Sequence, residues 1–252
     1  MLKIEHLTKV YDDGTLALDD VSFSVQDGEF LVVLGLSGAG KSTLLRCINR
    51  LIEPTEGKIT WNGTDITAAS RQELRTIRRR IGMIFQAFNL VERSSVMTNV
   101  LSGRLGYTST WRSLTGRFGK EDRELARRSL ERVGILELAH KRADELSGGQ
   151  RQRVGIARAL MQVPDMMLAD EPVASLDPVL AHSILRYLEQ LNKEAGITVI
   201  CSLHYMDLVR RYASRVVGLK DGRVVYQGLA DDITDERFKE IYGQEAERLS
   251  VA

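Results

Sequence analysis

The first third of the chain alternates short apolar stretches with turns. Val21, Phe23 and Val25 are separated by polar residues, which is typical of a strand with one buried face. Residues 30–34 form a continuous apolar run, and this favours a strand that is covered on both faces. A glycine-rich stretch then leads into residues 41–51, where the apolar positions have helical spacing. This part of the chain therefore predicts several strands and one helix.

The middle of the chain has a different pattern. Residues 87–161 contain no proline and several helical patterns rich in Arg and Glu, so they predict a mostly helical insert. Strand patterns precede this segment at 81–85 and return after it at 166–169 and 197–203. An amphipathic helix between the last two strands is predicted by the spacing of Leu180, Ile184, Leu188 and Leu191.

Two tight-turn signals complete the expected fold. Asn62-Gly63 and Asp221-Gly222 each separate two strand patterns, and both pairs tolerate the positive φ angles of a two-residue hairpin. Strands that alternate with helices favour an α/β fold with a mainly parallel sheet, and the hairpins favour an added antiparallel part. We expect one composite domain over residues 1–252, with a core of 1–86 and 162–230, a helical subdomain of 87–161 and a helical C-terminal tail of 231–252.

Composition narrows the class of protein. The 252 residues carry a formal net charge of +1, with 43% hydrophobic and 27% charged residues, as in an ordinary globular chain. This balance excludes a broadly basic nucleic-acid coat and an acidic solvating tail. No stretch approaches the roughly 18 uncharged apolar residues that a membrane helix needs. Residues 1–5 lack the apolar core of a signal peptide, so we expect the chain to stay in the cytoplasm.

Two local features are interpreted as structural. Cys47 and Cys201 each lie in an apolar stretch with no Cys or His at a metal-ligand spacing, which favours buried thiols over a disulfide or a zinc site. Residues 71–80 contain five arginines. Because no aromatic residues interleave them to stack on bases, a solvated helix face, partly paired with Glu73, is favoured over a nucleic-acid patch.

The glycine-rich stretch carries the first chemical signal. Residues 35–42 match the spacing G-x-x-x-x-G-K-[ST], and they follow a predicted buried strand and open a predicted helix. Glycines let the backbone wrap around an anion, and the N–H groups of the loop and of the helix start then point at phosphate oxygens. Lys41 can reach the β- and γ-phosphates, and the Ser42 hydroxyl can coordinate Mg²⁺. The residues expected to contact a nucleotide here are Gly35, Leu36, Ser37, Gly38, Ala39, Gly40, Lys41, Ser42 and Thr43.

Two acidic residues end the strand predicted at 166–169. In open α/β sheets ligands bind at the carboxyl ends of the strands, which would put Asp170 and Glu171 beside the glycine-rich loop. Asp170 would then hold Mg²⁺ through water, and Glu171 could accept a proton from an attacking water. Capping of the following helix is the alternative role for such a pair.

A second short motif, Leu146-Ser147-Gly148-Gly149-Gln150, precedes another predicted helix. Small residues, exposed N–H groups and the positive end of a helix dipole together favour an anion-binding helix start. An ordinary serine-capped helix with a glycine turn is the alternative for the isolated pentapeptide.

In their order along the chain, the three motifs resemble those of the ATP-binding cassette (ABC) transporter family. The resemblance covers essentially residues 1–230. Residues 35–42 resemble the Walker A loop, 168–171 the end of the Walker B strand, and 146–150 the family signature. The resemblance implies a P-loop NTPase core with the ABC ATPase fold. It also implies ATP and Mg²⁺ as ligands, and ATP hydrolysis that is coupled to transport.

The resemblance assigns roles to single residues as well. Gln86 resembles the Q-loop glutamine, which contacts Mg²⁺ or the attacking water, and His204 resembles the switch histidine, which contacts the γ-phosphate. Residues 175–177 resemble the D-loop, which crosses to the other subunit and contributes Asp177 to the nucleotide site. Tyr11 resembles the aromatic residue that stacks on adenine. The implied catalytic residues are Glu171, His204, Gln86 and Lys41, and the implied metal ligands are Ser42, Gln86 and Asp170.

A head-to-tail pair of such subunits is a further implication of the resemblance. Each ATP would lie between the Walker A loop of one copy and the signature residues of the other, so that a twofold dimer has two equivalent composite sites. ATP would close the dimer, and hydrolysis by in-line attack of water would reopen it. The signature residues expected to contact ATP across the dimer are Ser147, Gly148, Gly149 and Gln150.

Within the family, residues 100–112, 171–178 and 202–204 are similar to the ATPases of phosphonate importers, whose close relatives import phosphite or hypophosphite. This similarity implies two transmembrane permeases and an extracytoplasmic binding protein as partners, and no nucleic acid. The ATPase would be peripheral on the cytoplasmic face of the membrane, with the permeases docked near residues 86–99. Leu36 departs from the proline that is frequent at its position in the family.

Two other functions are kept as alternatives. A soluble ABC-type ATPase could act as a switch or assembly module, for example in a phosphonate-degrading complex, although this chain has one cassette and no long linker. A small-molecule kinase is the other option, but Gln150 and Glu171 would have no evident task in it.

Overall fold

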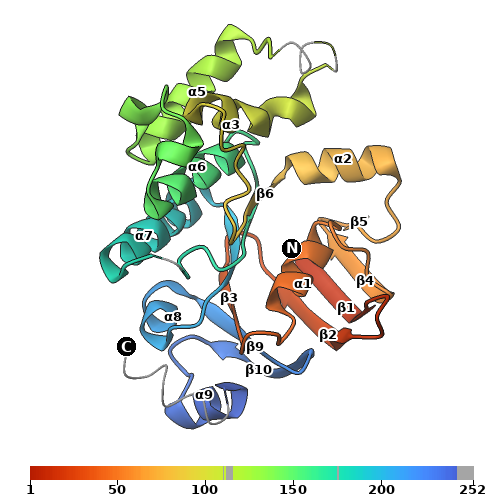
Figure 1. The fold of residues 1–252 in the computed structure, drawn as a ribbon. Helices are drawn as coiled ribbons and strands as arrows, with labels where there is room; N and C mark the ends of the chain where they lie inside the picture. The colour runs from red at the N-terminus through yellow and green to blue at the C-terminus, as the bar shows by residue number, and fades with distance from the viewer. Residues whose placement is uncertain (110, 112–115, 175, 243–252) are drawn as a thin grey trace.

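A six-stranded sheet runs through the middle of the computed structural model, which describes residues 1–109, 111, 116–174 and 176–242 (Figure 1). The strand order is β10-β9-β3-β8-β7-β6. Neighbouring strands are parallel except for β10, which pairs with β9 in the antiparallel sense. The strands are β3 (Phe30–Leu34), β6 (Ile81–Ile84), β7 (Met166–Ala169), β8 (Thr198–Ser202), β9 (Arg215–Lys220) and β10 (Arg223–Leu229).

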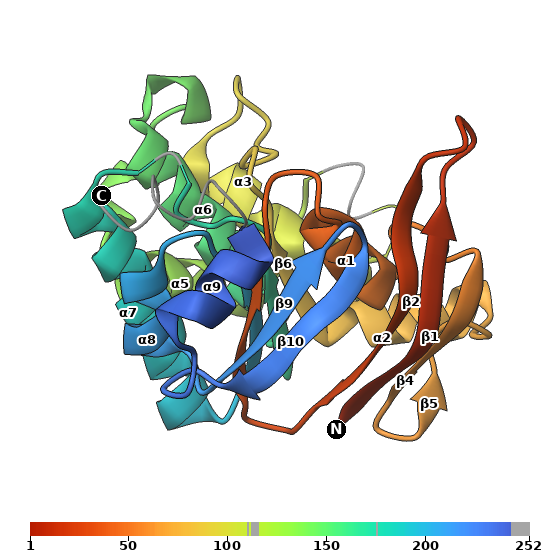
Figure 2. The same ribbon diagram turned by 90° about the horizontal axis from the view of Figure 1, so that it is seen from below.

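A four-stranded antiparallel sheet of order β2-β1-β4-β5 lies beside the larger one (Figure 2). Both predicted hairpins are confirmed, since Asn62-Gly63 joins β4 to β5 and Asp221-Gly222 joins β9 to β10. All four turn residues have positive φ angles, as a type I′ turn requires. The predicted α/β class with an added antiparallel part is therefore confirmed. The strands of this sheet are β1 (Leu2–Val10), β2 (Leu16–Val25), β4 (Glu56–Trp61) and β5 (Thr64–Asp65).

Strand β3 is covered on both faces, as its continuous apolar sequence predicts. Phe30, Val32 and Leu34 pack into a hydrophobic cluster formed with helices. Leu31 and Val33 point the other way, into a cluster that contains helix α1 (Lys41–Ile48) and the antiparallel sheet. Full burial of a side chain of this kind contributes roughly 1.5–3 kcal/mol. The loop that follows β3 therefore starts from a strand that is fixed from both sides.

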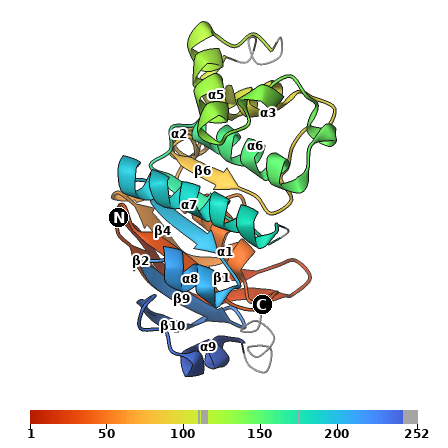
Figure 3. The same ribbon diagram turned by 90° about the vertical axis from the view of Figure 1, so that its left-hand side faces the viewer.

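Three helices gather at one end of the molecule (Figures 1 and 3). They pack on one another and on the larger sheet through a single hydrophobic cluster. They fall within the segment that the sequence predicts to be a helical insert. These helices are α3 (Val96–Leu101), α5 (Lys120–Arg132) and α6 (Gly148–Leu160), and the same segment holds the short 3₁₀ helices η1 (Ser102–Tyr107), η2 (Leu136–Leu138) and η3 (Ala143–Glu145).

Four more helices complete the described chain. Helices α7 and α8 belong to the hydrophobic cluster on one face of the larger sheet, and α9 lies against β9 and β10 (Figure 2). Among the described residues, no helix is long and apolar enough to cross a lipid bilayer. These helices are α2 (Arg71–Arg79), α7 (Pro178–Ala195), α8 (Met206–Tyr212) and α9 (Asp235–Tyr242).

Helix α9 reaches the start of the glycine-rich loop through its last residue. Tyr242 is fully buried, and its ring packs on that of Phe238 with 4.3 Å between the centroids. The Tyr242 hydroxyl accepts a hydrogen bond from the Gly35 N–H (3.3 Å) and donates one to the Leu203 carbonyl (3.4 Å). The tail helix thus ties the loop after β3 to the segment after β8.

The first prediction concerns this buried hydroxyl. Tyr242→Phe keeps the ring but leaves the Gly35 N–H and the Leu203 carbonyl without that partner, so the free energy of unfolding should fall by about 1–2 kcal/mol. Urea unfolding at neutral pH measures the change. The matched control is Tyr187→Phe: the Tyr187 hydroxyl is buried and has no hydrogen-bond partner among the described residues, so its loss should leave the stability unchanged or raise it. Equal changes in the free energy of unfolding for the two variants would contradict a stabilising role for the hydrogen bonds of the Tyr242 hydroxyl.

Candidate active site

The glycine-rich loop between β3 and α1 passes very close to neighbouring backbone. A Cβ atom at Gly35 would lie 2.4 Å from the Leu219 carbonyl oxygen, and one at Gly40 would lie 2.4 Å from the Ala17 carbonyl oxygen. Gly40 also has φ 99°, in the left-handed region that side chains rarely adopt. Only glycine fits at these two positions, so the loop keeps a shape in which its N–H groups can face an anion.

Lys41 opens helix α1 and is almost fully buried. Its ammonium donates hydrogen bonds to the carbonyl oxygens of Gly35 (2.8 Å) and Leu36 (2.9 Å), and it lies 3.6 Å from Glu171 Oε1. Burial lowers the pKa of Lys41, and the nearby Glu171 carboxylate acts against that shift. The positive charge therefore sits in the centre of the loop, where phosphate oxygens could replace the carbonyls as its partners.

Asp170 lies at the carboxyl end of β7 and is fully buried. Its carboxylate accepts hydrogen bonds from the Ser42 hydroxyl (2.7 Å) and from the Arg46 guanidinium (3.3 Å). The structure thus brings together two of the three predicted metal ligands. A hydroxyl and a carboxylate are hard oxygen donors of the kind that Mg²⁺ prefers, with substrate phosphates completing its shell. The residues present therefore fit this cation.

Glu171 is held by three side chains from three different segments. Its carboxylate accepts hydrogen bonds from His204 Nε2 (2.6 Å) and from Gln86 Nε2 (2.8 Å), in addition to the Lys41 contact. The hydrogen bond from His204 lowers the pKa of Glu171 more than burial raises it. The carboxylate is therefore ionised at neutral pH and can accept a proton. Gln86, the third predicted metal ligand, contacts this carboxylate rather than Ser42 or Asp170.

The backbone at Glu171 is in an unusual conformation. Its φ angle is 46°, in the left-handed region, and its N–H donates to the Ser202 hydroxyl (2.8 Å). A non-glycine residue in this region is strained and persists only where surrounding contacts hold it, which is common at functional sites. With this backbone conformation, the Glu171 side chain reaches Lys41 and His204.

Tyr11 lies at the edge of this site. Its hydroxyl is 3.0 Å from Thr43 Oγ1 on helix α1, and the Lys9 ammonium lies 5.4 Å from its ring centroid. Tyr11 is thus placed beside the end of the loop, where the sequence predicts an adenine contact.

The signature residues form a helix start at a separate place. Ser147 is the N-cap of α6: its hydroxyl accepts from the Gln150 N–H, and the Gln150 side chain accepts from the Ser147 N–H. At Gly149 a Cβ would lie 1.8 Å from Leu180 Cδ2 on α7, whereas at Gly148 it would meet no atom within 4 Å. No hydrogen bond or ion pair among the described residues joins this motif to the glycine-rich loop.

The predicted D-loop is described only in part. Asp177 caps helix α7, because its side chain accepts from the Leu180 N–H (3.0 Å). The prediction for Ser175 lies outside the described residues. Among the described residues, Asp177 thus acts as a helix cap.

Two residues of the site were not predicted from the sequence. Arg46 contacts Asp170 and lies one helical turn after Ser42, so the i, i+4 spacing on α1 is a signal that could have identified it. Ser202, which holds the Glu171 N–H, ends strand β8 beside β7. The adjacency of the two strands, which the sequence alone does not specify, is what makes this contact.

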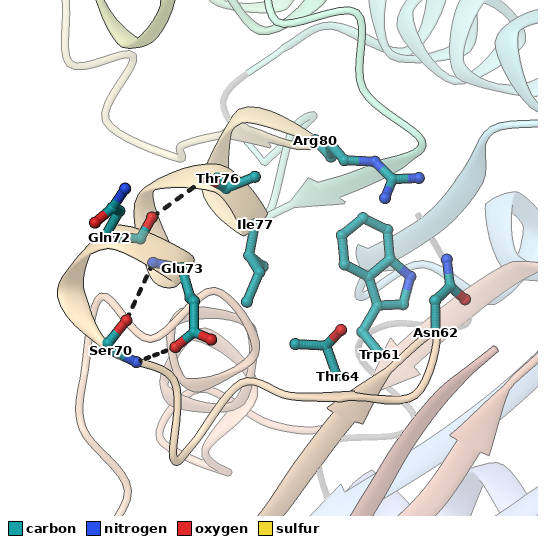
Figure 4. Close-up of a pocket in the computed structure, with 9 residues that line it drawn as sticks. All are labelled: Trp61, Asn62, Thr64, Ser70, Gln72, Glu73, Thr76, Ile77 and Arg80. Carbon is teal, nitrogen blue, oxygen red and sulfur yellow. Dashed lines mark hydrogen bonds between the residues drawn. The ribbon is translucent and has the colours of Figure 1, made fainter.

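One prediction about the arginine-rich helix is wrong. Glu73 does not pair with its arginine neighbours in the described structure; its carboxylate accepts from the Ser70 N–H and completes a capping box at the start of α2. Figure 4 shows this capping box at the edge of a pocket of about 630 Å³, between the β4–β5 hairpin and α2. The Arg80 guanidinium covers the Trp61 ring there, with 5.2 Å to the centroid. This pocket contains none of the predicted site residues.

The chain matches a known protein family and is similar to known proteins over nearly its full length. Residues 18–174 match the family model described as ABC transporter. The chain is similar to the phosphonates import ATP-binding protein PhnC of Bacillus anthracis, with 56% identity, covering 100% of this chain and 99% of the relative. It is similar to the protein of the same name from Bdellovibrio bacteriovorus, with 54% identity, 99% of this chain and 96% of the relative.

Solved structures give the same picture of the fold. The dimeric structure of MJ0796, described as a bacterial ABC transporter cassette, superposes with a TM-score of 0.82 and 34% identity, covering 91% of this chain and 99% of that one. A dimeric post-hydrolysis state of the same cassette, bound to ADP and Pi, gives a TM-score of 0.80 and 35% identity, with the same coverage of 91% and 99%.

The second prediction follows from the surroundings of Glu171. Glu171→Gln keeps the size of the side chain and one acceptor oxygen but removes its ability to take up a proton, so kcat for ATP hydrolysis should fall at least ~100-fold. The Kd for Mg-ATP should stay within about twofold, because the loop that faces the phosphates is unchanged. Steady-state turnover and equilibrium nucleotide binding check the two parts. The control is Glu124→Gln on the exposed face of α5, and substantial turnover of Glu171→Gln would remove Glu171 as the base.

Proposed function

The chain belongs to the ABC transporter family, and on that premise we propose that it is the ATP-hydrolysing subunit of a phosphonate importer. The observation that carries the proposal is the similarity, over essentially the whole chain, to proteins named as phosphonate import ATP-binding proteins. Phosphite and hypophosphite, which are smaller oxyanions of phosphorus, are the other solutes that the proposal allows.

The contacts of Glu171 support water attack as the chemical step. Glu171 is an ionised carboxylate that accepts the proton of a water as that water attacks the γ-phosphoryl in line. The bond between the γ-phosphorus and the bridging oxygen breaks, and ADP and phosphate leave. Lys41 stabilises the charge on the phosphate oxygens, and His204 and Gln86 hold the carboxylate in place from either side.

The Ser42–Asp170 pair is the proposed Mg²⁺ site. The Ser42 hydroxyl would bind the cation directly, and the buried Asp170 carboxylate would hold it through water. When bound, Mg²⁺ supplies positive charge to the β- and γ-phosphates. Arg46 keeps the Asp170 carboxylate oriented towards Ser42.

A second copy of the chain is the proposed partner at the nucleotide. Ser147 is exposed, and Gly148 has open space at its Cα, so both are accessible to a ligand held by another chain. Among the described residues no hydrogen bond or ion pair joins the signature motif to the loop of its own chain, which is consistent with a site completed by the partner copy. The helical segment 87–161, proposed to act as a subdomain, would carry the signature towards and away from that copy.

The membrane permeases are the second class of proposed partner, and they would hold the subunit at the cytoplasmic face of the membrane. Residues 86–99 are the proposed docking segment. A groove of about 560 Å³ between α2 and η1 is a further candidate contact, because its excess of positive charge favours an acidic segment of a partner. The charged residues that line the groove are Arg50, Glu53, Arg71, Arg75, Arg78 and Arg79.

The third prediction tests the importer function. We expect the chain, assembled in proteoliposomes with permeases and a binding protein encoded beside it, to drive ATP-dependent uptake of methylphosphonate, phosphite or hypophosphite. The binding protein loaded with the true solute should stimulate ATP hydrolysis. The complex that carries Glu171→Gln, assembled in the same way, should transport less than ~1% as much, in line with the loss of its base.

Two results would contradict this proposal. ATP hydrolysis that ignores the permeases and all three anions would favour the soluble switch module instead. Transfer of phosphate to a small molecule in place of water would favour a kinase.

A further inference from the structure

The turn that follows β6 has a strained backbone just after Gln86. Phe88 and Asn89 have φ angles of 58° and 49°, so two consecutive non-glycine residues are left-handed. Asparagine tolerates this region better than most residues, but phenylalanine has no such preference. A pair of this kind persists only where neighbouring groups hold it.

Helix α6 supplies the groups that hold this turn. The Arg158 guanidinium donates one hydrogen bond to the Phe88 carbonyl (2.9 Å) and a second to the Asn89 carbonyl. The Arg151 guanidinium, two turns earlier on the same helix, lies 5.3 Å from the centroid of the Phe88 ring. The planar fork of Arg158 can bond both carbonyls at once, and a lysine can bond only one at a time.

Arg158 lies in a partly buried environment. Burial of the side chain opposes its charge and lowers the pKa of Arg158, although a guanidinium remains protonated in proteins. A partly buried cation needs hydrogen-bond acceptors for the N–H groups that it withdraws from water, and among the described residues the two carbonyls of the turn are the acceptors that Arg158 has.

The same turn connects to the candidate base. Gln86, two residues before Phe88, donates from its amide to Glu171 Oε2 (2.8 Å). Two side-chain contacts, from Arg158 to the turn and from Gln86 to Glu171, are therefore joined by the short stretch of backbone between Gln86 and Phe88. At the other end of α6 lies Ser147, which starts the helix and is proposed to face the nucleotide of the partner copy.

We propose that Arg158 is a positioning residue for ATP hydrolysis: it clamps the Phe88–Asn89 turn so that Gln86 stays against Glu171. Because the clamp is built on α6, a movement of the signature helix shifts Gln86 as well. The position of Glu171 in one nucleotide site is thereby linked to α6, whose first turn is proposed to face the nucleotide in the other site. This inference rests on ATP hydrolysis by the chain and does not depend on the solute.

Loss of the clamp has a defined expected effect. Without Arg158 the turn can relax out of its left-handed conformation, and Gln86 then no longer presents its amide to Glu171. A displacement of about 1 Å at a reacting group can reduce kcat by up to ~100-fold, so a reduction of ~10-fold or more is expected. Nucleotide affinity should be unchanged within about twofold, because Lys41 and the glycine-rich loop are not involved.

The experiment compares Arg158→Met, Arg158→Lys and Arg153→Met in the full chain with Mg-ATP. Arg153 is the matched control: it lies on the same helix and also makes two hydrogen bonds, but to Val133 and Ser183, away from the turn. Arg158→Met should lower kcat with an unchanged KM and should speed amide hydrogen exchange at residues 86–90. Arg158→Lys should fall between Arg158→Met and the unchanged chain, and Arg153→Met should alter neither measurement.

A double-mutant cycle keeps the test decisive even if Arg158→Met folds poorly. If Arg158 acts through Gln86, then Arg158→Lys should lower kcat in the unchanged chain but cause no further loss once Gln86→Ala is present. Additive losses, or equal losses for Arg158→Met and Arg153→Met, would overturn the inference. Absence of ATP hydrolysis by the unchanged chain would instead contradict the proposed function, so the two failures are distinguishable.

Discussion

The rest of the site depends on one ionised carboxylate that is kept beside a buried ammonium. Glu171 and Lys41 lie 3.6 Å apart in a poorly solvated space, and each charge would be costly there without the other. The hydrogen bond from His204 and the charge of Lys41 keep the carboxylate ionised at neutral pH, and Gln86 donates a further hydrogen bond to it. An ionised carboxylate and a buried ammonium are thus in contact beside the glycine-rich loop.

The fold explains how these groups meet. The loop after β3, Gln86 after β6, the acids after β7 and His204 after β8 all follow the carboxyl ends of neighbouring parallel strands. Strand β3 is buried on both faces, and Tyr242 ties the loop to the segment after β8. The sheet therefore places these four segments at the same edge. The signature motif does not lie at this edge, because it starts α6, which packs with α3 and α5 at one end of the molecule.

Local patterns were sufficient to predict much of this arrangement. Strands β3, β6, β7 and β8, both hairpins and the glycine-rich loop follow from periodicity and from residues such as Asn62-Gly63, whose conformational preference is local. Contacts between distant segments could not be predicted in this way. Ser202 reaches the Glu171 N–H only because β8 is adjacent to β7, and Arg158 reaches its carbonyls only because α6 packs beside β6. Glu73 was misassigned because its backbone cap was a nearer partner than its arginine neighbours.

In the proposed function, one chain supplies the Glu171 carboxylate and the glycine-rich loop, and a second copy completes the site with its signature motif. Analytical ultracentrifugation of the Glu171→Gln chain in Mg-ATP tests this most directly, because ATP bound between two copies cannot be turned over and should keep them together. We expect a dimer in Mg-ATP and a monomer in Mg-ADP, and adding Ser147→Arg should abolish the dimer without weakening nucleotide binding. A chain that binds Mg-ATP tightly and remains a monomer at every concentration would contradict it.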